Sequence, residues 1–224
     1  MPGRGRPSVV LVPAIEAVLF DFGGVFTVSP FSVARSAGAD LGLETELAFE
    51  LCFGPYHEDT DHPWHRLERG EVALADARTA LVDLATARGV DVDPLTLLGR
   101  FRRDDEQRDE VIARTRAIKA RGIRTALVTN NVVEFGDAWR AMVPVDELFD
   151  VVIDSCKTGV RKPNVRIFEL ALGAVGATAD RAAFLDDHPA NVASAERLGI
   201  RGIVVGDDRV AAFDQLDRLL NGAG

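Results

Sequence analysis

Short apolar runs that each end near a polar residue are the clearest pattern along this chain. They read AVLF before Asp21, IRTALV before Thr129, FDVVI before Asp154 and AAFL before Asp186, with RGIVVG as a fifth run near residue 203. Their short length and their valine and isoleucine content favour buried strands over buried helices. We therefore expect five strands, the first of them over residues 15–20.

Helical patterns separate the later strands. Residues 105–122, 162–176 and 188–199 each place apolar residues at helical spacing, and each segment ends at a glycine, a frequent helix terminator. Strands that alternate with helices predict right-handed crossovers and a parallel sheet covered on both faces. The sequence thus predicts an α/β fold with a doubly wound, Rossmann-like core.

Residues 30–104 interrupt this alternation. Within them, residues 30–54 and 70–90 have the pattern of successive helices, with no convincing strand between them. We interpret 30–104 as a helical cap inserted into an α/β core made of residues 14–29 and 105–224. Residues 1–13, which begin with a run rich in glycine and arginine, are expected to form a loose tail.

Composition narrows the class of partner. The chain has 224 residues, of which 47% are apolar and 27% charged, as in ordinary soluble globular proteins. Its formal charge of −9 argues against a nucleic-acid partner held through phosphates. Since no stretch approaches the roughly 18 apolar residues that span a bilayer, we expect no membrane association and a cytoplasmic location. The N-terminus superficially resembles a signal peptide, but Pro13 and Glu16 interrupt its apolar run. Cys52 and Cys156 are predicted to be free thiols.

Polar residues follow the predicted strands at the places where ligands bind in open parallel sheets, beyond the carboxyl ends of the strands. Each of them alone has an ordinary explanation as a turn residue, a helix N-cap or a solvated loop residue. If the strands are adjacent, however, these side chains meet in one small volume. They are Asp21, Thr129, Asn130, Asn131, Lys162, Asp186 and Asp187.

The order of these residues resembles that of the haloacid dehalogenase-like hydrolase superfamily, from residue 14 to about residue 208. Four segments carry the resemblance in order: LFDFGGV, LVTNN, RKPNVRIF and FLDDHPANV. WHRLERGEV resembles a cap segment of members that begin FDxGGV or FDxGNV, among them sugar-phosphate phosphatases and the phosphatase-like domain of some epoxide hydrolases. The resemblance implies that Asp21 is a nucleophile, that Thr129 holds a phosphate oxygen and that Lys162 is the motif lysine.

Phosphoryl transfer gives these residues consistent chemical roles. It requires an in-line nucleophile, which a carboxylate can be, together with neutralised phosphate oxygens and a positioned metal. Lys162 would hold Asp21 ionised. The remaining candidates fall into two groups. Mg²⁺ ligands are expected from Asp21, the carbonyl group of Gly23, Asp186 and Asp187. Phosphate contacts are expected from Thr129, Asn130 and the amides of Phe22 and Gly24.

Gly23 departs from the family pattern, because most phosphatases of the superfamily carry there a second aspartate that protonates the leaving group. Such acid–base catalysis typically contributes about 10²- to 10⁴-fold. Either the substrate has a good leaving group, or another group supplies the proton, or the protein binds a phosphorylated ligand without turnover. For the second case the candidates are the histidines of the stretch YHEDTDHPWHRLERGE, and we expect His62 and His65 to contact substrate. The alternatives are that this stretch is a solvated loop or that its residues form a metal site, for which no regular ligand spacing is visible.

The leading hypothesis is a Mg²⁺-dependent phosphomonoesterase, slow or selective, that acts on a small phosphorylated metabolite through an aspartyl-phosphate on Asp21. A non-catalytic module that binds a phosphorylated metabolite or a partner is the first alternative. The second is a 2-haloacid dehalogenase, against which the paired carboxylates Asp186 and Asp187 argue, because haloacid dehalogenation uses no metal. A monomer or a homodimer is expected.

Overall fold

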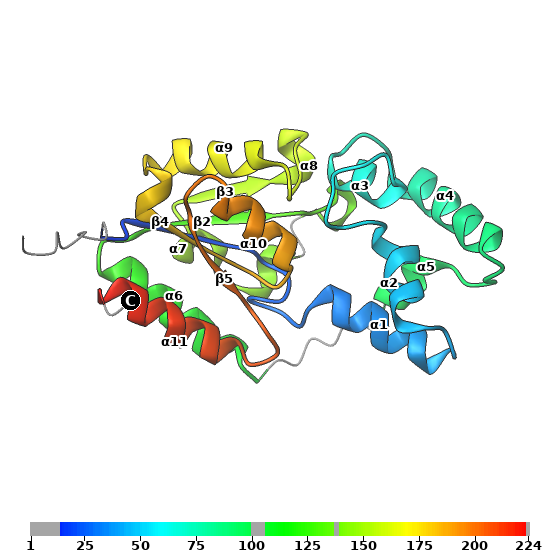
Figure 1. Cartoon of the computed structure of the whole chain (residues 1–224), viewed down its shortest axis with the longest axis horizontal. Coiled ribbons are helices and arrows are strands. Elements are labelled where there is room, and N and C mark those ends of the chain that lie inside the picture. The colour runs from blue at the N-terminus through cyan, green and yellow to red at the C-terminus, as the bar shows by residue number, and fades with distance from the viewer. Residues whose placement is uncertain (1–13, 100–105, 137–138, 223–224) are drawn as a thin grey trace, which may run out of the picture.

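The computed structural model describes residues 14–99, 106–136 and 139–222. In these residues, five parallel strands form one sheet in the order β3-β2-β1-β4-β5 (Figure 1). Each strand coincides with one of the five apolar runs, so the predicted α/β class and parallel sheet are confirmed. The tail expected for residues 1–13 lies outside the described residues. The strands are β1 (Ala17–Phe20), β2 (Arg124–Thr129), β3 (Val151–Asp154), β4 (Ala182–Asp186) and β5 (Arg201–Val204).

The strand register brings the polar strand ends to one edge of the sheet. Phe20 on the central strand β1 pairs with Leu127 of β2 on one side and with Leu185 of β4 on the other. The residue after Phe20 is Asp21, whose backbone N–H donates to the carbonyl oxygen of Leu185 at 2.8 Å. Asp21 therefore leaves the sheet beside the ends of β2 and β4.

Helices cover both faces of the sheet (Figure 1). On one face lie α6 (Arg108–Ala120), α7 (Val145–Leu148) and α11 (Arg209–Leu220); on the other lie α9 (Val165–Val175) and α10 (Pro189–Glu196). Alternate residues of each strand enter the two cores: Val18 and Phe20 pack on the first face, Ala17 and Leu19 on the second. This two-sided burial explains why the strands read as continuous apolar runs.

Helices also occupy the described part of the segment that we interpreted as a cap. They pack around a core of their own, which includes Phe31, Phe49, Phe53, Trp64 and Leu81. In Figure 1 they lie to one side of the sheet, beyond the carboxyl ends of the strands. The expected boundary at residue 104 falls outside the described residues and stays a prediction. The helices are α1 (Pro30–Asp40), α2 (Thr45–Phe53), α3 (Pro63–Glu68), α4 (Leu74–Ala87) and α5 (Pro94–Leu98).

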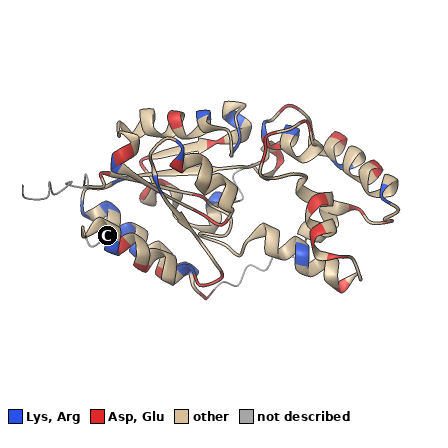
Figure 2. Cartoon of the chain, viewed as in Figure 1, with Lys and Arg blue, Asp and Glu red and all other residues tan. Residues whose placement is uncertain are grey.

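Short helical segments join the strands near the site. After β2 come the 3₁₀ turns η1 (Val133–Phe135) and η2 (Trp139–Met142), and after β3 comes α8 (Ser155–Thr158). Charged residues of both signs are interspersed over the core helices and the cap helices (Figure 2). Within the described ranges, every helix is too short or too polar to cross a bilayer.

Candidate functional site

A buried lysine joins carboxylates from two adjacent strands. Lys162 Nζ lies 2.6 Å from Asp21 Oδ1 and 2.7 Å from Asp186 Oδ2. All three side chains are buried. Burial by itself would lower the pKa of Lys162, but the charges of Asp186 and Asp21 raise it above its usual value. The ammonium group therefore stays charged and holds the two strand ends together.

Asp186 has a full set of hydrogen-bond partners. Besides Lys162, it accepts from the backbone N–H of His188 at 2.8 Å and from Asn191 Nδ2 at 3.1 Å. Asn191 lies at the start of α10, five residues after Asp186. Asn191 belongs to the fourth motif, where the sequence alone gives it no role, and the structure shows that it fixes the orientation of the Asp186 carboxylate.

Asp187 is the opposite case. Both of its carboxylate oxygens are buried and make no hydrogen bond of good geometry among the described residues, although the nearby Ser29 hydroxyl acts to lower the pKa of Asp187. Asp21, Asp186 and Asp187 each offer a carboxylate oxygen within 4.8 Å of the others. Burial, reinforced by the charges of Asp186 and Asp21, raises the pKa of Asp187 well above its usual value. Three carboxylates that face one ammonium group leave an excess of negative charge, which a divalent cation would balance.

Burial also acts on Asp21. It raises the pKa of Asp21 to about 7, while the charge of Lys162 acts in the opposite direction. The Asp21 carboxylate is thus costly to ionise because it is buried, whereas the charge of Lys162 favours its ionised form. A cation beside Asp21 would act in the same direction as Lys162.

The backbone at Gly24 makes room for Asp187. Gly24 has φ +73°, and a Cβ atom at this position would lie 2.2 Å from Asp187 Oδ2. A larger residue would therefore displace this carboxylate. The site fits a hard cation such as Mg²⁺. All of its donors are oxygens, and the absence of a side chain at Gly24 leaves room for the Asp187 carboxylate. Asp21, Asp186 and Asp187 are the residues that could hold it.

A cleft of about 1110 Å³ opens at this edge of the sheet, between the cap helices and the strand ends. Six of the residues singled out from the sequence line it, namely Asp21, Phe22, Gly23, Thr129, Asn130 and Asn131. Gly24 is not among the lining residues and packs against Asp187 instead.

The side chain of Asn130 is already engaged. Its Oδ1 accepts from the backbone N–H of Lys162 at 2.8 Å, and its Nδ2 donates to the Lys162 carbonyl oxygen at 3.1 Å and to Tyr56 Oη at 2.9 Å. The expected phosphate contact through this side chain would break these bonds. The structure instead gives Asn130 the role of positioning the loop that carries Lys162.

The structure does not place His62 and His65 in the lining of the cleft, where substrate contacts were expected of them. His65 is fully buried, with Nε2 2.8 Å from the carbonyl oxygen of Phe53 and Nδ1 3.1 Å from the backbone N of Thr60. His62 caps α3 by accepting from the backbone N–H of Trp64 at 3.3 Å. Burial lowers the pKa of His65 to about 3 and that of His62 to about 4, so both are neutral near pH 7.

A buried polar network that the sequence analysis missed joins the cap to the core beside Lys162. Arg161 is fully buried, and its Nε donates to Glu68 Oε2 at 2.7 Å. Glu68 Oε1 accepts from Tyr56 Oη at 2.9 Å and from Trp64 Nε1 at 2.8 Å. The Arg161 guanidinium also lies 4.5 Å from the centroid of the Tyr56 ring. We refer to Tyr56, Trp64, Glu68, Asn130 and Arg161 as the cap–core network.

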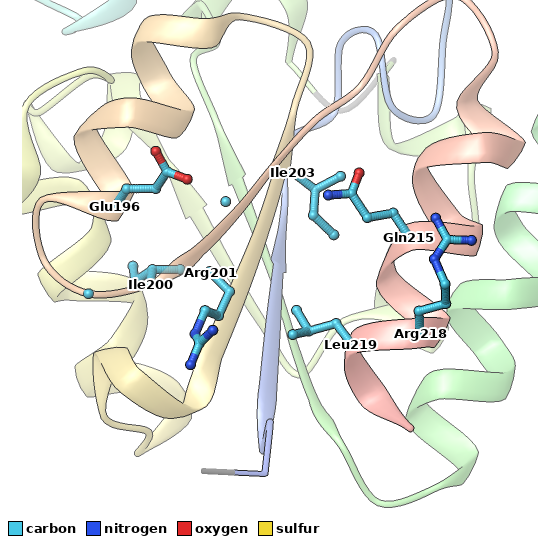
Figure 3. A pocket seen from close by; sticks show the side chains of 9 residues that line it. Glu196, Ile200, Arg201, Ile203, Gln215, Arg218 and Leu219 are labelled. Atoms are coloured by element: carbon cyan, nitrogen blue, oxygen red, sulfur yellow. The ribbon is translucent and has the colours of Figure 1, made fainter. Parts of the chain in front are cut away.

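A second hollow, of about 640 Å³, lies along the edge strand β5. Figure 3 shows Glu196 on one side of the strand and Gln215, Arg218 and Leu219 of α11 on the other. This hollow shares no lining residue with the cleft. The carboxylates that could hold a metal ion among the described residues, Asp21, Asp186 and Asp187, do not line it either. The cleft at Asp21 is therefore the candidate site.

Several curated proteins are similar to this chain in sequence. Acyl-CoA dehydrogenase family member 10 of Mus musculus is 30% identical over 211 residues, which are 92% of this chain and 19% of that protein. Bifunctional epoxide hydrolase 2 of Mus musculus is 31% identical over 107 residues, 46% of this chain and 19% of that protein. The chain thus matches less than one fifth of the length of these relatives. The sesquiterpene phosphatase astK of Aspergillus oryzae is 25% identical over 206 residues, 89% of this chain and 94% of that protein.

Solved structures show the same fold. A predicted HAD-like family hydrolase from Porphyromonas gingivalis matches with a TM-score of 0.65 and 26% identity, over 92% of this chain and 99% of that one. A HAD family enzyme from Bacteroides thetaiotaomicron, in complex with magnesium and inorganic phosphate, matches with a TM-score of 0.56 and 17% identity, over 87% and 96% of the two chains. The family model for haloacid dehalogenase-like hydrolases matches residues 15–199. The chain therefore belongs to the haloacid dehalogenase-like hydrolase family.

Proposed function

We propose that this chain is a Mg²⁺-dependent phosphomonoesterase that acts on a small phosphorylated metabolite through an aspartyl-phosphate on Asp21. The observation that carries the proposal is the uncompensated negative charge at the strand ends. The carboxylate oxygens of Asp187 are buried there without a hydrogen bond of good geometry among the described residues, and this carboxylate lies beside that of Asp21. Carboxylate oxygens of this kind suit a hard divalent cation, which in turn attracts a phosphate group.

Asp21 has the placement of a nucleophile, because it lines the cleft and is held 2.6 Å from Lys162 Nζ. An oxygen of Asp21 would attack the phosphorus while the bond from phosphorus to the leaving oxygen breaks. Water would then hydrolyse the acyl phosphate, which releases phosphate and regenerates the carboxylate. Mg²⁺, when bound by Asp21, Asp186 and Asp187, would supply charge neutralisation for the phosphoryl oxygens.

The other residues have supporting roles in this proposal. Thr129, which lines the cleft, and the amides of Phe22 and Gly24 would donate to phosphate oxygens. The carbonyl group of Gly23 would be a further ligand for the cation. Names of relatives support the reaction class, since astK is called a phosphatase and the Bacteroides enzyme was crystallised with magnesium and phosphate.

Gly23 favours a second candidate, a protein that binds a phosphorylated metabolite without turnover. Haloacid dehalogenation remains a third chemistry for an aspartate nucleophile, but the unpartnered Asp187 argues against it. That reaction uses no metal, and burial of a further carboxylate is costly without a cation.

Hydrolysis of an aryl phosphate with and without Mg²⁺, beside a panel of sugar phosphates and 2-haloacids, tests the proposal. We expect Mg²⁺-dependent release of phosphate. Asp21→Asn should lower this rate by about 10⁴-fold or more, as replacement of covalent nucleophiles does elsewhere. Asp83→Asn, at an exposed position of α4, is the matched control and should leave the rate unchanged.

Each other outcome selects a different function. Halide release without metal would replace the phosphatase proposal with dehalogenation. Mg²⁺-dependent binding of phosphate compounds without their hydrolysis would support the binding module. A variant Asp21→Asn with the parent rate would show that the measured activity belongs to a contaminant.

A further inference from the structure

The walls of the cleft beyond the strand ends are predominantly aromatic and aliphatic. Its volume of about 1110 Å³ is at the upper end for small-molecule sites, so it has room for a ligand much larger than a phosphate group. Apolar side chains come from both the cap and the core. They are Phe31, Phe53, Trp64 and Leu98 from the cap, and Phe22, Phe135, Trp139 and Met142 from the core.

The polar side chains of the cap that reach the cleft are already used within the protein. Tyr56 Oη and Trp64 Nε1 both point at Glu68 Oε1, at 2.9 and 2.8 Å, and Arg161 occupies Glu68 Oε2 at 2.7 Å. Tyr56 Oη also accepts from Asn130 Nδ2. A polyhydroxylated substrate would have to break these buried bonds in order to hydrogen-bond with the cap, at a cost in free energy.

Three of the polar residues on the core side, Thr27, Arg108 and Glu134, also make hydrogen bonds within the protein. Thr27 Oγ1 donates to the carbonyl oxygen of Val28 at 3.0 Å, and Arg108 Nε donates to that of Phe26 at 3.2 Å. Glu134 Oε1 accepts from the backbone N–H of Leu74 at the start of α4. Asn131 and Asn191 also line the cleft, both at the strand ends, and beyond them the cleft offers a substrate mainly ring faces and aliphatic surface.

The rim of the cleft has the same character. Phe135 in η1 lines the cleft with 47% of its surface exposed, and its neighbour Val133 is 60% exposed. Large apolar residues with this exposure are few among the described residues, and two of them share this short turn. An exposed apolar group at the mouth of a site is typical of a surface that a ligand covers.

We infer that the natural substrate is the phosphate monoester of a bulky hydrophobic alcohol, and that sugar phosphates are poor substrates. This inference rests on the proposed function and names the substrate class of the same site. The phosphate would lie at Asp21, and the apolar part would extend between the cap and η1–η2. Affinity for that part would come from burial of apolar surface and not from hydrogen bonds.

Straight-chain alkyl phosphates from butyl to decyl, used with Mg²⁺ below the concentrations at which they form micelles, test this inference. Their alcohols are nearly equal in basicity, so the glycine at position 23 affects all of them alike. We expect kcat/KM to rise about two- to fourfold per methylene until the cleft is filled. Glycerol 3-phosphate, which is similar in length to butyl phosphate but bears two hydroxyl groups, should be the poorer substrate.

Two variants connect the effect to the cleft. Phe135→Ser should lower the ratio of kcat/KM for decyl phosphate to kcat/KM for butyl phosphate by at least about threefold. This is the effect on kcat/KM expected from the loss of roughly one buried methylene group. Leu41→Ser is the matched control, because Leu41 is 50% exposed at the end of α1 and does not line the cleft. This control should leave the ratio unchanged.

The outcomes separate the inference from the proposed function. Equal kcat/KM along the alkyl series, or a preference for glycerol 3-phosphate, would overturn the hydrophobic substrate class while phosphatase activity stands. If none of the esters is hydrolysed, the proposed phosphatase activity is wrong. The ligand class is then tested by calorimetric titration of the protein with the alkyl phosphates in the presence of Mg²⁺. Affinity that rises with chain length would then uphold the apolar ligand class, and affinity independent of chain length would reject it.

Discussion

Residue 23 is a glycine, and a side chain at this position would point toward Pro30. A Cβ atom on Gly23 would lie 3.1 Å from Pro30 Cδ and 3.4 Å from Cγ, so the proline ring would have to move by a few tenths of an ångström. Apart from Asp21, the carboxyl groups that line the described cleft are Glu68 and Glu134. Both already accept hydrogen bonds from the protein. Neither is placed to replace the missing acid.

Gly23→Asp should therefore raise the rate of hydrolysis, and more for esters of basic alcohols than for aryl phosphates, whose leaving group needs less help from a proton. An effective acid is worth about 10²-fold or more. Gly23→Ala is the control, because it introduces the same crowding against Pro30 without a carboxyl group. The test measures kcat/KM of Gly23→Asp and of Gly23→Ala, first for an alkyl phosphate and then for an aryl phosphate. The ratio of the Asp variant to the Ala variant gives the effect of the carboxyl group on each ester. A ratio near one for both esters would show that leaving-group protonation does not limit this protein.

Individual site residues differ in how far the sequence determines them. Asp21, Asp186 and Asp187 could be found because each follows an apolar strand, and parallel strands bring their ends together. His65 could not be assigned correctly, because a histidine in a turn-rich stretch has the same sequence pattern whether its ring nitrogens face a substrate or the carbonyl oxygen of Phe53. Arg161 was missed because a basic residue before Lys162 is typical of a solvated turn. Its burial depends on Glu68, which is distant in sequence.

At the scale of elements, α3 is the part of the cap that is bound to the core by buried charge. Glu68 at the end of α3 is 3% exposed and meets Arg161, which is fully buried. The backbone supports the same contact, since Ser155 Oγ at the start of α8 donates to the Glu68 carbonyl oxygen at 2.6 Å. Gly70, just after α3, lies so close to Cys156 that a Cβ atom would be 2.5 Å from its carbonyl oxygen.

Arg161→Met should destabilise the protein by about 3–5 kcal/mol, because it leaves the buried Glu68 carboxylate without its cation. Urea denaturation measures the loss. Glu68→Gln alone leaves Arg161 with only the more distant carboxylate of Asp59, at 3.7 Å, and should also be costly. The double variant should lose less than the sum of the two single losses, because neither charge is then left alone. Additive losses would mean that the two side chains do not interact across the cap and the core.

The cap also contains a group that makes stability depend on pH. His65 has a pKa of about 3 in the folded protein, lowered by burial, against about 6.5 in an unfolded chain. The unfolded state therefore binds more protons, so this contribution to stability is complete above pH 6.5 and decreases as the pH falls toward 3. Between pH 8 and pH 5, the free energy of unfolding of the wild type should fall by at most about 2 kcal/mol more than that of His65→Gln. His57→Gln, at an exposed position, should follow the wild type; parallel curves for all three proteins would contradict the buried neutral state of His65.

Elements were predictable where one local pattern determines them. The inner strands β1, β2 and β4 are buried on both faces, so their apolar runs carry the signal without help from neighbours. The helices α9 and α10 follow from their helical spacing and terminal glycines. The turns η1 and η2 lack such a period, although they supply Phe135 and Trp139 to the cleft. Their conformation is set by contacts with other parts of the chain, such as the edge-to-face contact of Trp139 with Phe22 at 5.1 Å.

At the scale of the whole molecule, the net charge of −9 and the buried carboxylates both favour the binding of a cation to the folded protein. Without a cation, the folded protein holds Asp21, Asp186 and Asp187 against one lysine, and unfolding relieves their repulsion. A cation that binds the folded state stabilises it by an amount that grows with the logarithm of its concentration, about 2.7 kcal/mol at one hundred times Kd. The thermal stability of the chain should therefore depend on Mg²⁺.

We expect Mg²⁺ to raise the Tm of the wild type by several degrees for each 1 kcal/mol of binding free energy. KCl at equal ionic strength serves as the control for screening of the surface charge. Asp187→Asn should have two opposite effects: a higher Tm without Mg²⁺, because a buried unpartnered carboxylate is gone, and little further rise when Mg²⁺ is added. Asp83→Asn also removes one negative charge but from an exposed position, so its Tm should rise with Mg²⁺ as the wild type does. Differential scanning calorimetry of the three proteins gives the answer, and an equal Mg²⁺ response in Asp187→Asn and the wild type would place the cation away from Asp187.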